Sequence, residues 1–317
     1  TPNKQTRYAA YNVPAPKNTP EWPMWRKNAR RLGTDPSDGT PLPPGFCRKD
    51  TNPPAVPSNA SAKGYWFLGK DGGIFSFDAP FHGSLPGLGI KTQVLNMAST
   101  PSGNGYWILG KDGGVFAFGD AKFHGNTVGI NLAAPVISLT PTPDGNGYWL
   151  LASDGGIFSY GSAKFYGSTG ALKLNAPVIA MSPTPDGGGY WLLGADGGIF
   201  SYGNAKFYGS TGGMKLNAPV VSMAPSPKSA PNGGYWLLGG DGGVFSFGPG
   251  APYAGSVPGT GLCSAAPGVQ LRASNTGKGY WILGGDGGIF AFGDAKFHGS
   301  YPGLSPDRAA IDMAIRR

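Results

Sequence analysis

The sequence predicts an all-β protein, a six-bladed β-propeller, on the basis of two repeated motifs and a matching segment at the C-terminus. The phrase Gly-Tyr-Trp occurs six times, beginning at Gly64, Gly105, Gly147, Gly189, Gly234 and Gly279. An Asp-Gly-Gly turn follows each copy, at Asp71, Asp112, Asp154, Asp196, Asp241 and Asp286. The copies are 41 to 45 residues apart. A period of this length with strand-like composition is typical of propeller blades.

A single repeat unit predicts four antiparallel strands. Aromatic and aliphatic residues that favour strands alternate with turn residues. Asp196-Gly197 predicts a tight hairpin, because glycine tolerates the positive φ that such turns need. The four expected strands of this unit begin at Ala176, Gly189, Gly198 and Asn204.

The C-terminal segment is expected to close the ring. Residues 309–315 align with the apolar runs that begin the other units, for example the run from Pro177, whereas the first unit is preceded by the proline-rich segment from Asn52. We therefore expect Ala309 to Ile315 to form the innermost strand of the first blade. This pairing would remove an exposed sheet edge.

The composition divides the chain into two parts, an extended basic arm (residues 1–50) and the propeller (residues 51–317). The arm holds nine Lys and Arg against four acidic residues, and the remainder holds sixteen against thirteen. A nearly neutral propeller does not indicate a nucleic-acid-binding face. No stretch is long and apolar enough to span a membrane.

The arm contains one expected helix, with Thr19 as its N-cap and Pro20 at its first position. Its apolar face carries Trp22, Trp25 and Leu32, while Arg26 and Arg30 lie mostly off that face. Such a helix either docks on a protein surface or lies on a membrane. We favour docking to a larger assembly, because the helix is short and has a proline in its first turn.

The two cysteines, Cys47 and Cys263, are too few for a disulfide scaffold or a zinc site. A bridge between them would fasten the arm to the ring. A bridge and two free thiols both remain open at this point.

The repeated polar residues are candidates for chemistry, and most favour a structural role. The Asp-Gly-Gly aspartates indicate hairpin turns rather than calcium loops, since a calcium loop needs several oxygen ligands close together. The three histidines share one slot of the repeat with two tyrosines and an alanine, and sixfold geometry would hold them apart. No catalytic residue, metal site or cofactor is therefore predicted.

This slot and a neighbouring lysine are the candidate binding residues. Aromatic or imidazole rings beside a lysine suit sugar binding, but also suit plain surface packing. The candidates are His82, His124, Tyr166, Tyr208 and His298, with Lys122, Lys164, Lys206 and Lys296.

The axial channel of the expected propeller is the other candidate location. One position of the innermost strands holds Asn96, Ser138, Ala180, Ser222, Gln270 and Asp312. A single carboxylate does not make a catalytic centre, which needs paired acids or a nucleophile with a base.

The unit from Gly189 to Gly212, with its Gly-Tyr-Trp, Asp-Gly-Gly-Ile-Phe and Ala-Lys-Phe-Tyr-Gly motifs, resembles a repeat of secreted actinobacterial proteins and of tail and virion proteins of their phages. The resemblance covers residues 64 to about 304 and carries no catalytic residues. It implies an attachment module at the virion surface, or alternatively a secreted, extracellular protein that binds the bacterial cell wall. The expected partners are a larger assembly, reached through the arm, and envelope polysaccharide. An enzyme with its site in the channel is the third hypothesis.

Overall fold

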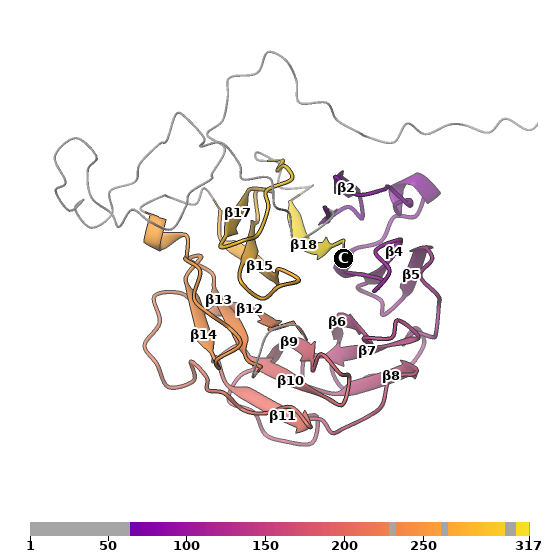
Figure 1. Cartoon of the computed structure of the whole chain (residues 1–317). Coiled ribbons are helices and arrows are strands. Elements are labelled where there is room, and N and C mark those ends of the chain that lie inside the picture. Colours follow the sequence, from indigo (N-terminus) through magenta and orange to yellow (C-terminus); the bar gives the residue numbers. More distant parts are fainter. Residues whose placement is uncertain (1–63, 228–232, 261–265, 302–308, 317) are drawn as a thin grey trace, which may run out of the picture.

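The computed structural model describes residues 64–227, 233–260, 266–301 and 309–316, and these fold into six antiparallel sheets of three strands each (Figure 1). The only helical elements among them are two 3-10 turns, η1 (Pro86–Leu88) and η2 (Pro258–Thr260). This architecture is all-β and consistent with a β-propeller-like fold. The high content of glycine, proline and aromatic residues explains why strands and turns prevail.

Each sheet has an inner, a middle and an outer strand. The inner strands are β18 (Ala310–Ile315), β3 (Val94–Ser99), β6 (Val136–Pro141), β9 (Val178–Pro183), β12 (Val220–Pro225) and β15 (Gly268–Ala273). The middle strands, which carry the Gly-Tyr-Trp motifs, are β1 (Tyr65–Gly69), β4 (Gly105–Gly110), β7 (Gly147–Ala152), β10 (Gly189–Gly194), β13 (Tyr235–Gly239) and β16 (Tyr280–Gly284). The outer strands are β2 (Ile74–Phe77), β5 (Val115–Gly119), β8 (Ile157–Gly161), β11 (Ile199–Gly203), β14 (Val244–Phe247) and β17 (Ile289–Phe292).

The inner strands surround a common centre. Each contacts the inner strand of the next sheet, and β18 contacts both β15 and β3. Figure 1 shows the sheets following one another around this centre. The core therefore lies in the spaces between neighbouring sheets.

The first sheet is assembled from both ends of the described chain, as the sequence predicts. β18 pairs antiparallel with β1, and Tyr65 stands opposite Ile315. The segment before β1 lies outside the described residues. The prediction that the C-terminal segment supplies the innermost strand of this sheet is confirmed.

The prediction of four strands in each unit is wrong. After each outer strand the chain is extended but forms no ladder in the described residues, for example from Ala205 to Gly209. Its backbone groups bond to tryptophan and tyrosine side chains instead, as described below. Strand propensity does not show whether the backbone groups of a segment bond to a neighbouring strand or to side chains.

The middle strands explain why the repeat is so aromatic. Tyr, Trp and the following apolar residues of every middle strand are almost completely buried. One face of each strand packs on the preceding sheet and the other on the next, so Trp191 and Leu193 share a cluster with Tyr235 and Leu237. Strands buried on both faces are expected to be continuously apolar, as these are.

The same packing joins the last unit to the first. Tyr65 and Phe67 share a buried cluster with Trp281 and Leu283. The rings of Tyr65 and Trp281 lie edge to face at 6.3 Å. The first and last sheets are thus joined by the same types of residue, at the same positions of the repeat, as any two consecutive sheets.

The hairpin interpretation of the Asp-Gly-Gly motifs is confirmed. Oδ1 of Asp196 accepts a hydrogen bond from the amide of Gly198 at 3.0 Å, and Gly197 has φ +80°. The equivalent bond forms in the other five units. The aspartates therefore have a local structural role in the turns.

The arm residues Trp22, Trp25, Arg26, Arg30 and Leu32 lie outside the described residues, and so do Cys47 and Cys263. Within the part of the chain that the structure describes, no helix is long and apolar enough to cross a membrane.

Candidate functional site

The segment that follows each outer strand carries the candidate binding residues, and a tryptophan of its own unit fixes it. The indole N–H of Trp191 donates to the backbone carbonyl of Lys206 at 2.8 Å. The tryptophans of the other five middle strands make the equivalent bond, to Pro80, Lys122, Lys164, Pro252 and Lys296. A buried indole N–H needs such an acceptor, so the segment keeps a fixed position on its sheet.

A tyrosine of the next unit holds the same segment from the other side. The hydroxyl of Tyr190 accepts from the amide of Tyr166 at 3.1 Å and donates to the carbonyl of Gly167 at 2.6 Å. Burial raises the pKa of Tyr190, so the phenol remains a donor. The other five tyrosines of the Gly-Tyr-Trp motifs bind the preceding unit in the same way.

These bonds place the predicted ring residues between sheets. His82, His124, Tyr166, Tyr208 and His298 are all half-buried. Each ring lies edge to face against the tyrosine of the next unit, at centroid distances of 5.3 to 5.8 Å. The rings therefore contribute to packing between units, and the structure does not bring the five together in one place.

The preceding residue is the exposed aromatic of the segment. Exposed fractions run from 43% to 61% for Phe81, Phe123, Phe165, Phe207 and Tyr253, whereas Phe297 is buried. Lys122, Lys164 and Lys206 are exposed beside them, and Lys296 is half-buried. Sequence reasoning missed these phenylalanines, because it took the position that varies between His and Tyr as the surface position. The only sequence signal is that the preceding slot is aromatic in all six units.

One concave site combines a predicted lysine and a predicted tyrosine. A cleft of about 270 Å³ lies between the fourth and fifth units; we call it the inter-sheet cleft. The residues that provide its aromatic and polar side chains are Asp186, Trp191, Asn204, Lys206 and Tyr208. The cleft therefore offers one half-buried aromatic ring, that of Tyr208, with a cation, an amide and a carboxylate, while Trp191 is only 3% exposed.

The carboxylate of the cleft is held in position from two directions. The hydroxyl of Thr184 donates to Oδ1 of Asp186 at 2.7 Å, and the amide group of Asn204 donates to Oδ2 at 2.7 Å. The hydrogen bond from Thr184 is the main reason that the pKa of Asp186 is lowered. Asp186 is therefore a fixed acceptor at neutral pH.

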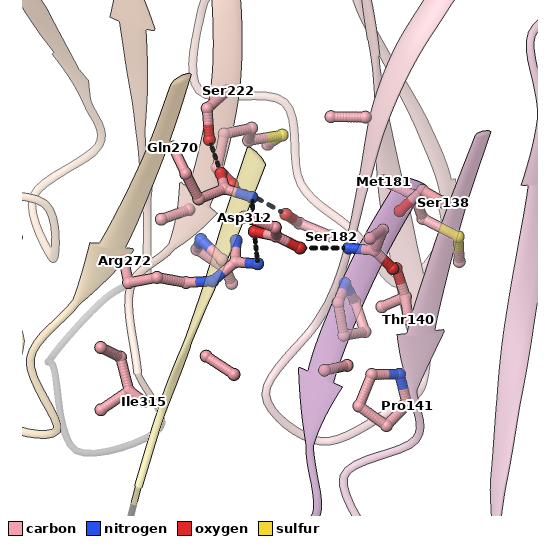
Figure 2. Close-up of a pocket in the computed structure, with 18 of the residues that line it drawn as sticks. Ser138, Thr140, Pro141, Met181, Ser182, Ser222, Gln270, Arg272, Asp312 and Ile315 are labelled. Atoms are coloured by element: carbon pink, nitrogen blue, oxygen red, sulfur yellow. Dashed lines mark hydrogen bonds and ion pairs between the residues drawn. The ribbon is translucent and has the colours of Figure 1, made fainter. Parts of the chain in front are cut away.

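The second concave site is a central cavity of about 500 Å³, lined by residues of all six inner strands and shown in close-up in Figure 2. Its lining includes all six residues that the sequence aligns at one position of the inner strands: Asn96, Ser138, Ala180, Ser222, Gln270 and Asp312. Sequence alignment of the repeats therefore identified these lining positions correctly.

Asp312 lies at the centre of a hydrogen-bond network in this cavity and is 2% exposed. Its carboxylate accepts from Asn96 Nδ2 at 2.6 Å, Gln270 Nε2 at 2.6 Å and Arg272 Nη2 at 3.0 Å. The backbone amides of Met97 and Met313 also donate to it, at 2.9 and 2.7 Å. Figure 2 shows Arg272 and Gln270 reaching Asp312 from the same side. Five donors fill the capacity of one carboxylate.

Sequence reasoning missed Arg272, which forms the ion pair with Asp312 at 3.0 Å. The arginine stands two residues after Gln270 on β15, where the other inner strands carry small or apolar residues. It also donates through Nε to the carbonyl of Met313 at 2.9 Å. Asp312 and Arg272 thus link β18 to β15, and Asn96 links β18 to β3.

The histidines differ in their surroundings. Nδ1 of His298 lies 2.7 Å from Oδ2 of Asp78, so this ring connects the last unit to the first. Desolvation lowers the pKa of His82, and Arg316 adds to this while Asp120 opposes it. Within the described residues no three His, Cys, Asp or Glu side chains are grouped so that they could hold a metal ion.

Two comparisons of the sequence with known proteins gave no relative. A scan of the sequence against models of protein families found no match, and a search among curated proteins found none either.

Proposed function

We propose that this protein is a non-enzymatic attachment module: a closed six-bladed propeller that binds polysaccharide of a bacterial envelope. The observation that carries the proposal is the inter-sheet cleft, where the half-buried ring of Tyr208 lies beside Asp186, Asn204 and Lys206. Sugar rings present apolar faces that pack on aromatic side chains and hydroxyls that need both donors and acceptors. The cleft supplies each of these groups.

The fixed geometry of the cleft supports binding. Trp191 is held by its bond to the Lys206 carbonyl, and Asp186 by Thr184 and Asn204. Side chains that are already ordered lose little entropy when a ligand binds, so affinity is gained at small cost. A rigid site of modest size suits recognition of one or two sugar units.

Repetition supports attachment in particular. Lys122 with His124, Lys164 with Tyr166 and Lys296 with His298 occupy the equivalent places in other units. Several weak sites on one rigid body gain affinity by avidity, and more so when many copies sit on one particle. This arrangement fits a protein that must hold a large surface rather than release a small product.

The chemistry of the central cavity favours a non-enzymatic function. Asp312 already accepts five hydrogen bonds and pairs with Arg272. A general acid or base must exchange a proton with substrate, and an acceptor with every position occupied is poorly suited to that. The network instead ties neighbouring sheets together.

The location follows from the resemblance of the repeat. We infer a protein of the virion surface, in the tail of a phage that infects actinobacteria, with residues 1–50 docked on a larger assembly. A secreted cell-wall-binding protein of the bacterium itself is the alternative. Sedimentation of purified virions with an antibody against this chain separates the two: the chain remains with the particles only in the first case.

The binding proposal is tested by lysine substitutions. Replacing Lys122, Lys164, Lys206 and Lys296 by Met keeps the aliphatic stems and removes the charges. Binding to purified actinobacterial cell walls should then fall at least tenfold, because each weakened site multiplies the loss of avidity. Tyrosine substitutions are less suitable, since Tyr166 and Tyr208 pack between sheets.

The matched control replaces Lys91, Lys111, Lys173 and Lys215 by Met, which removes the same number of charges from exposed positions that do not line the cleft. Binding by this control should equal that of the parent chain. Equal binding by the fourfold variant would move recognition away from these sites. Release of soluble sugar by the parent chain but not by Asp312→Asn would show that it is an enzyme.

A further inference from the structure

The inner strands present backbone amides to the central cavity. Each inner strand is an edge strand, so every second N–H points away from its middle strand and toward the cavity. Pro183 stands at one such position, opposite Tyr190, and Pro141 and Pro225 occupy the equivalent places. Proline has no N–H to satisfy and is tolerated on an edge strand for this reason.

Two residues before these prolines, the amide that points inward needs an acceptor. In three units a side chain of a neighbouring inner strand provides it. Asp312 Oδ2 accepts from Met97 at 2.9 Å, Asn96 Oδ1 from Leu139 at 2.8 Å, and Ser222 Oγ from Leu271 at 3.1 Å. The aligned position identified above therefore caps the amide of the following unit.

Three units break this pattern: Met313 donates to Asp312 of its own strand, and in the other two the amide has no such acceptor. The residues that should cap Met181 and Met223 are Ser138 and Ala180. Alanine has no acceptor, and within the described chain neither amide has a hydrogen bond to a side chain or to a carbonyl outside its own sheet. Because Met181 and Met223 face non-bonded partners, Leu192 and Leu237, their N–H groups are directed into the cavity.

The cavity leaves both backbone donors and backbone acceptors free, because a residue that faces a non-bonded partner directs its N–H and its C=O inward. The free donors are the amides of Met181 and Met223 and the hydroxyl of Ser138, with the partly exposed guanidinium of Arg272 on β15, the strand next to that of Met223. The acceptors of Asp312 are already in use. An unpaired buried amide costs free energy comparable to a lost hydrogen bond, so a ligand with oxygen acceptors would gain by reaching it.

We propose that the central cavity binds a small organic anion through a carboxylate that accepts from the amides of Met181 and Met223. The ion pair of Arg272 with Asp312 leaves the cavity close to neutral, so the two uncapped amides rather than net charge hold the carboxylate, and the ligand's hydroxyls can donate to the inward carbonyls. The volume of about 500 Å³ accommodates a ligand the size of a sugar acid. This site is separate from the inter-sheet cleft, and either can fail without the other.

The test uses the full chain labelled with ¹⁵N only in methionine. The six methionine amides then report separately, and Met97 and Met313, which already donate to Asp312, are internal controls. We expect acetate and glucuronate to shift the Met181 and Met223 signals in a saturable manner, and glucose to leave them unchanged. Inorganic phosphate distinguishes a general anion site from a carboxylate site.

A substitution that completes the missing cap provides the second measurement. Ala180→Asn introduces the residue type that Asn96 provides at the equivalent position, where it accepts from the amide of Leu139. The new side chain should accept from the amide of Met223 and move its signal downfield before any probe is added. The dissociation constant for glucuronate should then rise at least tenfold, as expected for loss of one hydrogen bond to a charged group.

The proposal is overturned if no probe gives a saturable shift in the parent chain, or if Met97 and Met313 shift as much as Met181 and Met223. It is also overturned if the Met223 signal of Ala180→Asn moves downfield and this variant still binds glucuronate as tightly as the parent. Phosphate binding without carboxylate binding would overturn the carboxylate assignment.

Discussion

Removing the hydroxyl of Tyr65 measures how firmly the first unit is joined to the last. This hydroxyl accepts from the amide of His298 at 2.9 Å and donates to the carbonyl of Gly299 at 2.6 Å. Tyr65 belongs to the first unit and both partners belong to the last. The mutation Tyr65→Phe removes these two bonds and preserves the buried ring.

The cost of this mutation follows from the groups it leaves behind. One amide and one carbonyl lose their partner in a part-buried position, and each unsatisfied group costs about 1–3 kcal/mol. We expect the free energy of unfolding to fall by about 3 kcal/mol. For a domain of this size, about 1 kcal/mol corresponds to roughly 2–4 °C in Tm, so the expected loss is roughly 6–12 °C.

Two control variants make the measurement specific. Tyr190→Phe removes the same pair of bonds between the third and fourth units, to Tyr166 and Gly167. Tyr202→Phe removes a hydroxyl at a position where other units carry Phe, and should change stability by less than about 0.5 kcal/mol. Thermal unfolding followed by circular dichroism and urea unfolding give the three values.

If the last junction equals the others, Tyr65→Phe and Tyr190→Phe should cost the same within about 0.5 kcal/mol. A Tyr65→Phe variant as stable as the parent, with Tyr190→Phe clearly destabilised, would refute the reasoning that the ring is closed by the same contacts throughout.

Three further predictions concern other parts of the ring. Asp312→Asn should lower the free energy of unfolding by about 3 kcal/mol, because it removes the charge that pairs with a partly buried arginine; urea unfolding measures this. His82→Tyr should reduce the pH dependence of the free energy of unfolding near pH 6.5. Folding lowers the pKa of His82 from 6.5, so the unfolded chain takes up the proton first. The parent chain therefore loses stability as the pH falls through that value. Urea titrations between pH 8 and 5.5 measure the difference. Gly167→Ala should cost about 3 kcal/mol in unfolding experiments, because its Cβ would overlap the ring of Tyr202, whereas Gly213→Ala meets no atom within 4 Å and should cost only about 1 kcal/mol for its positive φ.

A specific result would contradict each of these three predictions. Asp312→Asn with parental stability would mean that the network contributes nothing. A His82→Tyr variant with the pH profile of the parent would assign that dependence to another group. Equal losses for Gly167→Ala and Gly213→Ala would show that backbone conformation, and not the approach of the next sheet, determines the requirement for glycine.

The sequence predicted the strands with a clear hydrophobic pattern and failed for the segment that follows them. The middle strands were recognisable because they are buried on both faces. The segment from Ala205 to Gly209 has similar local composition, but its amides and carbonyls bond to Trp and Tyr side chains. A partner that lies in another unit cannot be inferred from local propensity.

Exposure within that segment was also predicted incorrectly. The neighbours Phe207 and Tyr208 are both aromatic, yet Phe207 is 61% exposed and Tyr208 packs against Tyr235. The direction of each ring depends on the approach of the next sheet. Only the assembled ring decides which of two adjacent aromatics faces the solvent.

Some tertiary contacts did leave a trace in the repeat. Two positions of the repeat, 18 residues apart, contact each other through their side chains. One of the two is an aspartate and the other carries a hydroxyl or an amide, and which position holds the aspartate differs between units. The pairs are Ser102–Asp120, Asp144–Ser162, Asp186–Asn204 and Thr276–Asp294. Two aspartates would repel each other, so this exchange signals contact.

The sequence by itself determined the number of units, the hairpin turns and the origin of the last inner strand. These features depend on periodicity and on turn chemistry, which are local and repeated. The tertiary structure decided which amides are capped, which aromatics are exposed and how Arg272 meets Asp312. These depend on the distance between neighbouring inner strands, and that distance is set only when all the sheets pack around one centre.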